Sequence, residues 1–413
     1  MALFAGFGAT DLTPPIGVEL AGYGYYLNRR AERVMDPLFA RAISIRQGDV
    51  RFIAISCDLL GLDEAGAART RELLRDRHGL AGDRVLLVCT HTHTGPAVDW
   101  LEGCGVRDDA YANSLPERIA QAAAAAIGDE RPVTGFARCE RAIEPVGFNR
   151  ADPDGPLDAH VRGAALYRGD CSPIALVSHG CHPVTLGRST AISADYPGWV
   201  CAAMAERGFR AAFFNGLCGD VDPVSNRDAW GSGTVDTIAG YGRRIADGFA
   251  GGLVDGPIPS LRAARLRFAL RVRQVDAAAA ADAVEALRGP DSPETRVARV
   301  WQAEMAARAA ADVEYADVSM AALSDVVLAA LPYEGFTAIA DCARAHLPGR
   351  VALILGCADK TMGYLPAAGE FERGSYAASA SAMLYMRPLF VPGQAEALGD
   401  GLGKALARAF PIE

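Results

Sequence analysis

Short apolar segments alternate with alanine-rich amphipathic segments along most of this chain. The apolar segments predict β-strands at residues 51–55, 85–89, 174–178, 211–214, 261–272, 325–331 and 351–355. The segments between them predict α-helices at residues 65–77, 115–127, 196–206 and 238–249. Strands and helices that alternate in this way are typical of an α/β fold. We therefore expect a mixed β-sheet flanked by helices.

Two further segments, residues 275–288 and 293–313, are rich in Ala, Glu and Arg and are separated by Gly289-Pro290. Each has an apolar face, so together they predict an antiparallel helical hairpin inserted at residues 275–313. Such a hairpin can act as a lid or can simply cover a core, and the sequence leaves both roles open. Because no internal repeat or linker marks a second domain, we expect residues 1–413 to form a single domain.

The motif Thr90-His91-Thr92-His93 follows directly after the apolar segment 85–89 and leads into Gly95-Pro96. If the strand continues through the motif, His91 and His93 project to the same face. Adjacent imidazoles can bind a metal ion or orient water and substrate. Two histidines at a polar strand end can also be hydrogen-bonded and do nothing further, because short motifs often arise by chance.

The other histidines favour a functional site. A second apolar segment, residues 174–178, leads into His179 and His182, so four of the seven histidines follow two predicted strands. Acidic and phenolic residues follow other predicted strands or turns in the same way: Asp220, Glu334 and Tyr364. In open α/β sheets the site lies beyond the carboxyl ends of the strands, so we expect these side chains to converge. An ionised Glu334 after so apolar a strand requires a cation or several hydrogen-bond donors.

Composition and charge exclude several classes of protein. The 413 residues are 50% hydrophobic and carry a net charge of -9 without a basic stripe, which argues against nucleic acid as a partner. No segment reaches the roughly 18 consecutive apolar residues that a membrane helix requires, and the N-terminus lacks the pattern of a signal peptide. We expect a globular cytoplasmic protein without stable membrane insertion, and the sequence leaves a homo-oligomer open.

The ten cysteines form no CxxC pair, and several lie inside apolar segments. This usage is typical of buried, reduced cysteines. Cys181 and Cys218 lie beside the motifs described above. They keep open a role as metal ligand or nucleophile, and thus a cysteine hydrolase as an alternative.

The motifs occur in a characteristic order along nearly the whole chain: Gly8 to Pro15, Thr90 to Pro96, His182, Gly219-Asp220-x-x-Pro223, Pro332-x-Glu334 and Gly363-Tyr364. In this order they resemble the catalytic domain of neutral/alkaline (non-lysosomal) ceramidases and their small bacterial relatives. The resemblance implies one zinc ion per chain. It assigns the metal ligands to His91, His182, Glu334 and Tyr364, and it implies that His93 is not a ligand. Iron and manganese also suit such a ligand set.

The reaction that the resemblance implies is hydrolysis of a carbon-nitrogen amide bond by metal-activated water. Arg150, which follows Asn149, would hold the substrate carbonyl or the developing oxyanion. His93 or Asp220 would accept and deliver the proton. The resemblance thus predicts a metal-dependent amidohydrolase.

One position departs from the family pattern, because Asp222 stands where the family has a serine at the reaction centre. A carboxylate there can act as a base, orient a ligating histidine, recognise a cationic group or cap its own turn. Asp58 and Asp195 also follow apolar segments, and each is expected either to hydrogen-bond a ligating imidazole or to cap a helix.

Because the chain ends at residue 413, we expect it to lack the C-terminal β-sandwich domain of full-length ceramidases, and we expect no secretory signal. We therefore expect a small soluble N-acyl compound as substrate rather than membrane-borne ceramide. An esterase or lactonase with the same zinc site is one alternative. A non-catalytic, metal-dependent ligand-binding protein is another.

Overall fold

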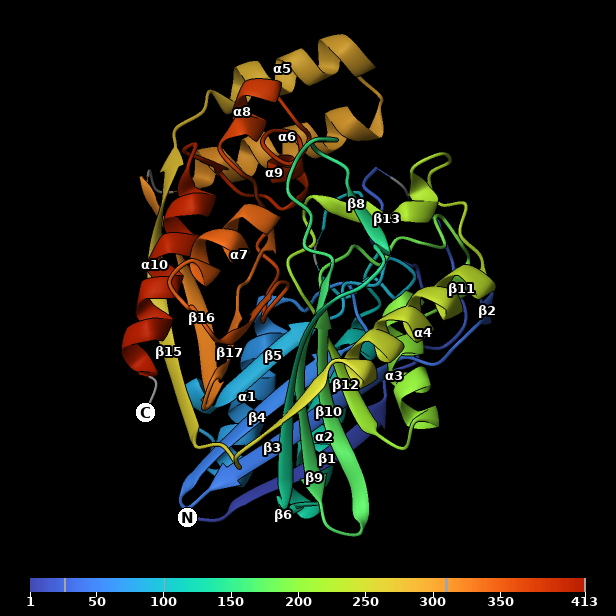
Figure 1. Cartoon of the computed structure of the whole chain (residues 1–413). Coiled ribbons are helices and arrows are strands. Elements are labelled where there is room, and N and C mark those ends of the chain that lie inside the picture. Colours follow the sequence, from blue (N-terminus) through green and yellow to red (C-terminus); the bar gives the residue numbers. More distant parts are fainter. Residues whose placement is uncertain (26, 100, 309–310, 412–413) are drawn as a thin grey trace.

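The computed structural model describes residues 1–25, 27–99, 101–308 and 311–411. Within these residues the longer strands form three five-stranded sheets, each with parallel and antiparallel neighbours. The predicted α/β class is confirmed. The structure contains three mixed sheets packed together where one was expected (Figure 1). The segments that the sequence predicted as strands all belong to these three sheets.

The first sheet has the order β5-β4-β3-β1-β6 and the second has the order β12-β10-β9-β7-β14. The strands of the first sheet are β1 (Leu3–Asp11), β3 (Phe39–Gln47), β4 (Val50–Cys57), β5 (Val85–Cys89) and β6 (Arg131–Pro132). The strands of the second are β7 (Gly135–Ala142), β9 (His160–Arg168), β10 (Cys171–His179), β12 (Arg210–Asn215) and β14 (Leu253–Gly256).

The third sheet has the order β19-β17-β16-β15-β21. Its strands are β15 (Leu261–Arg273), β16 (Val313–Leu323), β17 (Val326–Ala330), β19 (Val351–Leu355) and β21 (Leu389–Phe390). Three short pairs complete the sheets: β2 (Arg33–Val34) with β11 (Ala191–Ile192), β8 (Gly147–Asn149) with β13 (Val221–Pro223), and β18 (Glu334–Gly335) with β20 (Tyr364–Leu365).

The three sheets share one topology, although no repeat is visible in the sequence. In each sheet the first three strands in chain order run antiparallel to their neighbours, a helix follows, and the next strand of the sheet returns parallel to the third. A longer helix then packs against the unit. The helices of the three units are α1 (Glu64–His78) and α2 (Asp109–Gly128), α3 (Asp195–Glu206) and α4 (Val235–Gly251), and α7 (Thr337–Arg344) and α10 (Gln394–Ala409). The chain thus repeats one arrangement three times.

Two kinds of hydrophobic core follow from this arrangement. One face of each sheet packs into a common central core, to which Ile43, Leu176 and Leu328 belong. The opposite faces pack under the helices in three separate cores. Burying one such large aliphatic side chain contributes about 1.5–3 kcal/mol. Strands buried on both faces read as continuous apolar segments, which explains why the parallel strands were predicted and several antiparallel ones were not.

The predicted helical hairpin is confirmed as α5 (Ala277–Arg288) and α6 (Pro293–Ala307), which lie together at the top of Figure 1. The second helix is shorter than predicted: it ends at Ala307, residues 309–310 lie outside the described residues, and β16 begins at Val313. Val297 of α6 packs with Cys104 and Leu384 in a small separate core. The hairpin is therefore anchored to the loops and to the short helix α9 (Ser381–Leu384).

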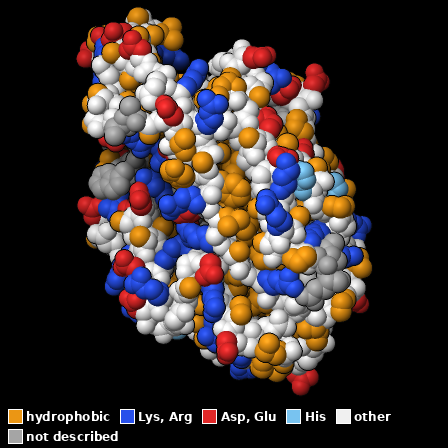
Figure 2. Space-filling model, turned by 90° about the vertical axis from the view of Figure 1, so that its left-hand side faces the viewer, with side chains coloured by type: hydrophobic (Ala, Val, Ile, Leu, Met, Phe, Trp, Pro, Cys, Tyr) orange, Lys and Arg blue, Asp and Glu red, His pale blue; other side chains and the backbone are white. Residues whose placement is uncertain are grey.

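The side of the molecule formed by β15 and α10 carries many Lys and Arg side chains beside a band of hydrophobic ones (Figure 2). Arginines of β15 pair with acidic residues here, since Arg267 lies 2.8 Å from Asp317 and Arg265 lies 3.2 Å from Asp359. Acidic neighbours therefore pair with these two arginines of β15. Among the described residues, no helix combines the length and the apolar character that crossing a bilayer requires.

Candidate metal centre

The loops that carry the predicted site residues meet at one end of the three sheets. His91 and His93 follow β5 of the first sheet, and His182 follows β10 of the second. Glu334 begins β18 after β17 of the third sheet, and Tyr364 begins β20 after β19. The side chains come together as the sequence predicts, because strand ends from three sheets enclose a single space.

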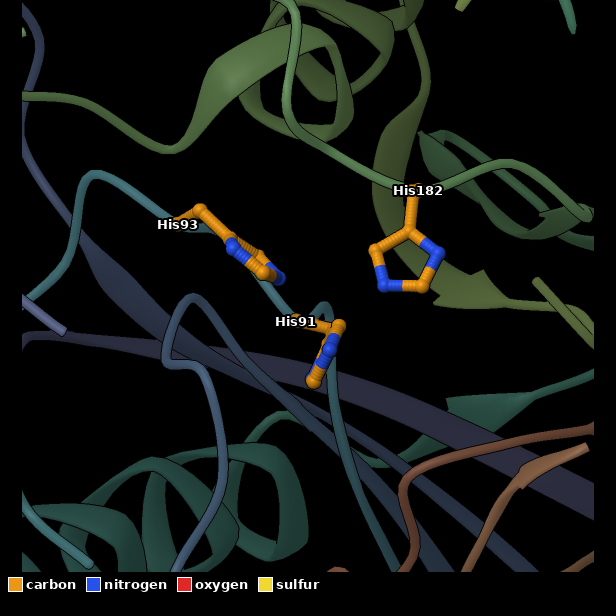
Figure 3. A group of neighbouring side chains, drawn as sticks. All are labelled: His91, His93 and His182. Atoms are coloured by element: carbon orange, nitrogen blue, oxygen red, sulfur yellow. The ribbon is translucent and has the colours of Figure 1, made fainter. Parts of the chain in front are cut away.

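Three imidazoles point toward one another in this space (Figure 3). One ring nitrogen from each of His91, His93 and His182 lies within 4.8 Å of the others, and all three residues are buried. The ring centroids are 4.9 Å apart for His91 and His93 and 5.1 Å apart for His91 and His182. Within the described residues, this histidine group is the arrangement that can hold a metal ion.

Glu334 completes the cluster from the opposite side. Its Oε2 atom lies 2.9 Å from His182 Nε2 and 3.2 Å from His91 Nε2, and the residue is 1% exposed. Within the described part of the chain, Oε2 of Glu334, Nε2 of His91 and both ring nitrogens of His93 find no hydrogen bond of acceptable geometry. Buried polar atoms rarely stay without a partner. A group of such atoms aimed at one point fits a bound cation.

Backbone carbonyls orient two of the imidazoles. His91 Nδ1 lies 2.7 Å from the carbonyl oxygen of Leu60, and His182 Nδ1 lies 2.6 Å from that of Cys218. A carbonyl can only accept, so each Nδ1 donates, and in the neutral ring each Nε2 then carries the lone pair that a metal ion can bind. This tautomer is the one that a metal ligand requires.

Of the two roles left open for Asp58 and Asp195, the structure does not show, among its described residues, a hydrogen bond to an imidazole. Asp58 accepts from the Phe39 amide at 3.0 Å and pairs with Arg41 at 2.5 Å. Asp195 accepts from the amides of Thr185 and Tyr196 at 3.0 and 2.6 Å. In the described structure both carboxylates therefore bind groups other than the three imidazoles, and backbone carbonyls orient the rings instead.

Strand alternation does not bring His91 and His93 together, contrary to the expectation from the sequence. The strand β5 ends at Cys89, and His91 has the left-handed φ of 69°. A non-glycine residue in this conformation is strained by about 1–3 kcal/mol and is held by its surroundings. Here the His91 amide donates to the Leu59 carbonyl at 2.9 Å. The two rings are neighbours because of this turn and not because of strand alternation.

His93 lies between the other imidazoles and an aromatic wall. Its ring centroid is 5.0 Å from that of Tyr23, which in turn meets the ring of Trp230 edge-on at 4.9 Å. Burial, together with the nearby rings of His91 and His182, holds the pKa of His93 well below its usual range. His93 is therefore held as a neutral imidazole.

Arg150 and Tyr364 form the third side of the site. The Arg150 guanidinium donates to the Tyr364 hydroxyl at 2.9 Å and to the Gly219 carbonyl at 3.0 Å, and it pairs with Asp222 at 3.0 Å. The Tyr364 hydroxyl also lies 3.4 Å from His182 Nε2. Burial and the charge of Glu334 raise the pKa of Tyr364 well above its usual value.

The strand pair β8 and β13 carries this third side. Asn149 lies opposite Val221, and Phe148 lies opposite Asp222. The Arg150 amide donates to the Asp220 carbonyl at 2.8 Å. The pairing of β8 with β13 fixes Arg150 beside Asp222, whose carboxylate neutralises the guanidinium.

Asp220, which was expected to join the cluster, instead accepts hydrogen bonds at Thr337, the first residue of the helix α7. Its Oδ1 atom accepts from the amide and the hydroxyl of Thr337 at 2.9 and 3.0 Å, and Asn149 donates to its Oδ2 at 3.4 Å. Burial raises the pKa of this carboxyl group to about 6. These contacts tie α7 to the strand pair β8 and β13.

Sequence reasoning missed two tyrosines of the site. Tyr385 donates a short hydrogen bond to Oε1 of Glu334, and Tyr23 packs on His93. Neither belongs to a motif. One signal for Tyr23 was its neighbour Gly22, which has a φ of 112° and lies so close to His93 that a Cβ atom would stand 2.5 Å from the imidazole.

No protein-family model and no curated protein matches this sequence. Two solved structures do match its fold: the neutral ceramidase from Pseudomonas aeruginosa, and a ceramidase complexed with C2. Each is 17% identical to this chain, with a TM-score of 0.76 over 100% of this chain and 76% of the other. The resemblance inferred from the motifs is thus confirmed at the level of the fold, and the chain folds as the neutral ceramidase does.

Proposed function

We propose that this protein is a zinc-dependent hydrolase that cleaves the amide bond of a small soluble N-acyl compound. The observation that carries the proposal is the convergence of His91, His182 and Glu334: Oε2 of Glu334 lies 3.2 and 2.9 Å from the two Nε2 atoms, and neither it nor His91 Nε2 has a hydrogen bond of acceptable geometry among the described residues. The likeness to the fold of neutral ceramidase, whose name denotes an amide hydrolase, supports the reaction class.

The proposed ligands are His91, His182, Glu334 and Tyr364. Two imidazoles, a carboxylate and a phenol oxygen form a donor set that suits zinc. A zinc ion bound there would polarise an amide carbonyl and acidify a water molecule. The imidazole of His93 is close enough to ligate as well, but we assign it to proton transfer, because it is the one ring of the three without a carbonyl partner to fix its orientation.

We propose that Arg150 binds the carbonyl oxygen of the substrate and the negative charge that develops on it. Its guanidinium is already oriented by the Gly219 carbonyl and Asp222, so little reorganisation is needed when that charge appears. The role of Asp222 is then to hold Arg150 in place. The contact between the two side chains supports this role over a direct role as base.

We propose that Asp220 supports the site without transferring a proton. Its hydrogen bonds to Thr337 anchor the start of α7, which follows Glu334 closely in the chain. Proton transfer by His93 is the simpler route, since that ring already lies within the cluster.

Cytoplasmic location and the choice between monomer and homo-oligomer stay predictions.

The alternatives make different predictions. An esterase or lactonase would use the same ligands, and matched amide and ester substrates with the same acyl group distinguish it. A binding protein would retain metal and ligand without turnover. A cysteine hydrolase is disfavoured, because Cys181 and Cys218 are both fully buried; it would be resistant to chelation and sensitive to alkylation.

The experiment that tests the proposal is elemental mass spectrometry on the wild type and on the His182→Ala and Glu334→Gln variants, prepared identically. We expect about one zinc per chain in the wild type and a loss of most of it in both variants. The surface variant His346→Ala is the control, because His346 pairs with Asp400 away from the site. Equal metal in all four proteins, or none in the wild type, would contradict the zinc site.

A further inference from the structure

The two carboxylate oxygens of Glu334 have different surroundings. Oε2 faces His91 Nε2 and His182 Nε2 at 3.2 and 2.9 Å. Oε1 accepts a short hydrogen bond from the hydroxyl of Tyr385. The carboxylate is therefore oriented along one axis, with one oxygen directed at the imidazoles and the other bound to a phenol.

Tyr385 itself is held firmly. It directly follows α9, and its amide donates to the Ser381 carbonyl at 3.2 Å. Gly363 packs against its ring, since a Cβ atom on Gly363 would lie 2.9 Å from the ring carbon Cγ. The ring also meets that of Tyr364 edge-on, with centroids 6.4 Å apart. The hydroxyl thus reaches Glu334 from a fixed position.

The hydroxyl of Tyr385 acts as a donor. The hydroxyl lies against Oε1 of Glu334, and an ionised carboxylate oxygen can only accept, so the phenol is the donor. A donor on Oε1 occupies one lone pair of that oxygen and fixes the carboxylate with Oε2 toward the imidazoles, which favours metal binding through Oε2.

We infer that Tyr385 is a positioning residue that makes Glu334 a one-oxygen ligand and so sets the coordination number of the metal. The inference rests on the proposed function, because it concerns the ion that His91 and His182 would share with Glu334. Groups that hydrogen-bond metal ligands typically change metal affinity by about 10–100-fold when they are removed. Without Tyr385 the carboxylate would be free to rotate and to bind through both oxygens, which would occupy the position that water or substrate requires.

Two variants of the full chain separate this role from a general loss of packing. Tyr385→Phe removes the hydroxyl and keeps the ring. Tyr333→Phe is the matched control, because Tyr333 adjoins Glu334 in the chain and is fully buried, but its hydroxyl has no hydrogen-bond partner among the described residues. Both variants and the wild type are loaded with zinc and titrated with a chromophoric chelator, and each is also loaded with Co²⁺ for visible spectroscopy.

We expect Tyr385→Phe to bind zinc about 10–100-fold more weakly than the wild type. We also expect weaker visible absorption from its Co²⁺ form, since five-coordinate Co²⁺ absorbs less than four-coordinate Co²⁺. Tyr333→Phe should match the wild type in both measurements. A merely structural role of Tyr385 would alter thermal stability without changing the Co²⁺ spectrum.

The outcomes separate the two proposals. If the wild type binds zinc and Tyr385→Phe has the same affinity and the same Co²⁺ spectrum, the positioning role is overturned and the zinc site stands. If Tyr333→Phe changes as much as Tyr385→Phe, the effect is one of packing and the positioning role is again overturned. If the wild type binds neither ion, the proposed function fails, and this inference fails with it.

Discussion

Glu334 and Tyr364 lie directly opposite each other as register partners in the parallel strand pair β18 and β20. Backbone hydrogen bonds in this pair, such as the one from the Glu334 amide to the Gly363 carbonyl at 2.9 Å, join two loops that leave neighbouring strands of the third sheet. A carboxylate and a phenol that face the same imidazole, His182, are thereby fixed by the backbone. Residues placed on paired strands hold a site more accurately than residues on free loops.

Replacing Arg150 by Gln should lower kcat/KM by about 10²–10³-fold, because a donor oriented toward a developing oxyanion is typically worth that much. Metal content should stay at the wild-type level, since among the described residues Arg150 contacts the proposed ligands through Tyr364. Steady-state kinetics and elemental analysis on one preparation check both expectations. Arg227→Gln is the control, because Arg227 is exposed and stacks on Phe148. An equal loss of activity in the two variants would contradict the role of Arg150.

Replacing Asp222 by Asn tests whether this residue holds Arg150 or acts as a base. The ion pair of 3.0 Å would become a weaker neutral hydrogen bond, so we expect kcat to fall by roughly 10-fold, or about 1.4 kcal/mol. A holding role leaves the shape of the pH–rate profile unchanged. The loss of one limb of that profile in Asp222→Asn would instead identify Asp222 as the base.

The carboxyl group of Asp220 should make the stability of the folded protein depend on pH. Its pKa is about 6 in the folded state because of burial, compared with the usual value of 3.8 for an aspartate. Between these values the folded state binds a proton that the unfolded state does not, so the free energy of unfolding falls as pH rises from about 4 to about 6, and this group changes it no further above that range. The size of the effect is at most about 3 kcal/mol.

Urea unfolding of the wild type and of Asp220→Asn between pH 4 and 7 measures this contribution. Both proteins are treated with chelator, so that metal release at low pH does not enter the comparison. The difference in unfolding free energy between them should shift in favour of the wild type toward low pH. A difference that is constant over the whole range would show that Asp220 does not titrate there.

Gly22→Ala should displace His93 and remove activity. A Cβ atom at this position would stand 2.5 Å from the imidazole, and the φ of 112° disfavours any side chain. Gly17→Ala separates the two causes, because Gly17 has a φ of 97° but a Cβ atom added there would meet nothing within 4 Å. Thermal unfolding should show a loss of roughly 1–3 kcal/mol in both variants, whereas activity should be lost in Gly22→Ala alone. Full activity in Gly22→Ala would argue against a role for His93.

The sequence alone was sufficient for the buried parallel strands and for the residues that follow them. Strands such as β5 and β17 are buried on both faces and therefore read as continuous apolar segments. The side chains placed after them, among them His91, His182 and Glu334, were identified because polar residues directly after such segments are conspicuous. Several antiparallel strands were missed: β7 is only partly buried, and β9 is mostly buried but is interrupted by Arg162 and Gly163.

Only the tertiary structure decided how these elements combine. The threefold repetition of one topology lies in the order and pairing of strands, which leaves no mark in the local hydrophobic pattern. The left-handed turn at His91, the carbonyl of Cys218 that orients His182, and the contact of Tyr385 with Glu334 are likewise set by segments far apart in the chain. Local sequence determines which side chains a strand end presents. Which groups then meet them depends on the packing of distant segments, and that packing is fixed only when the three sheets close around their common core.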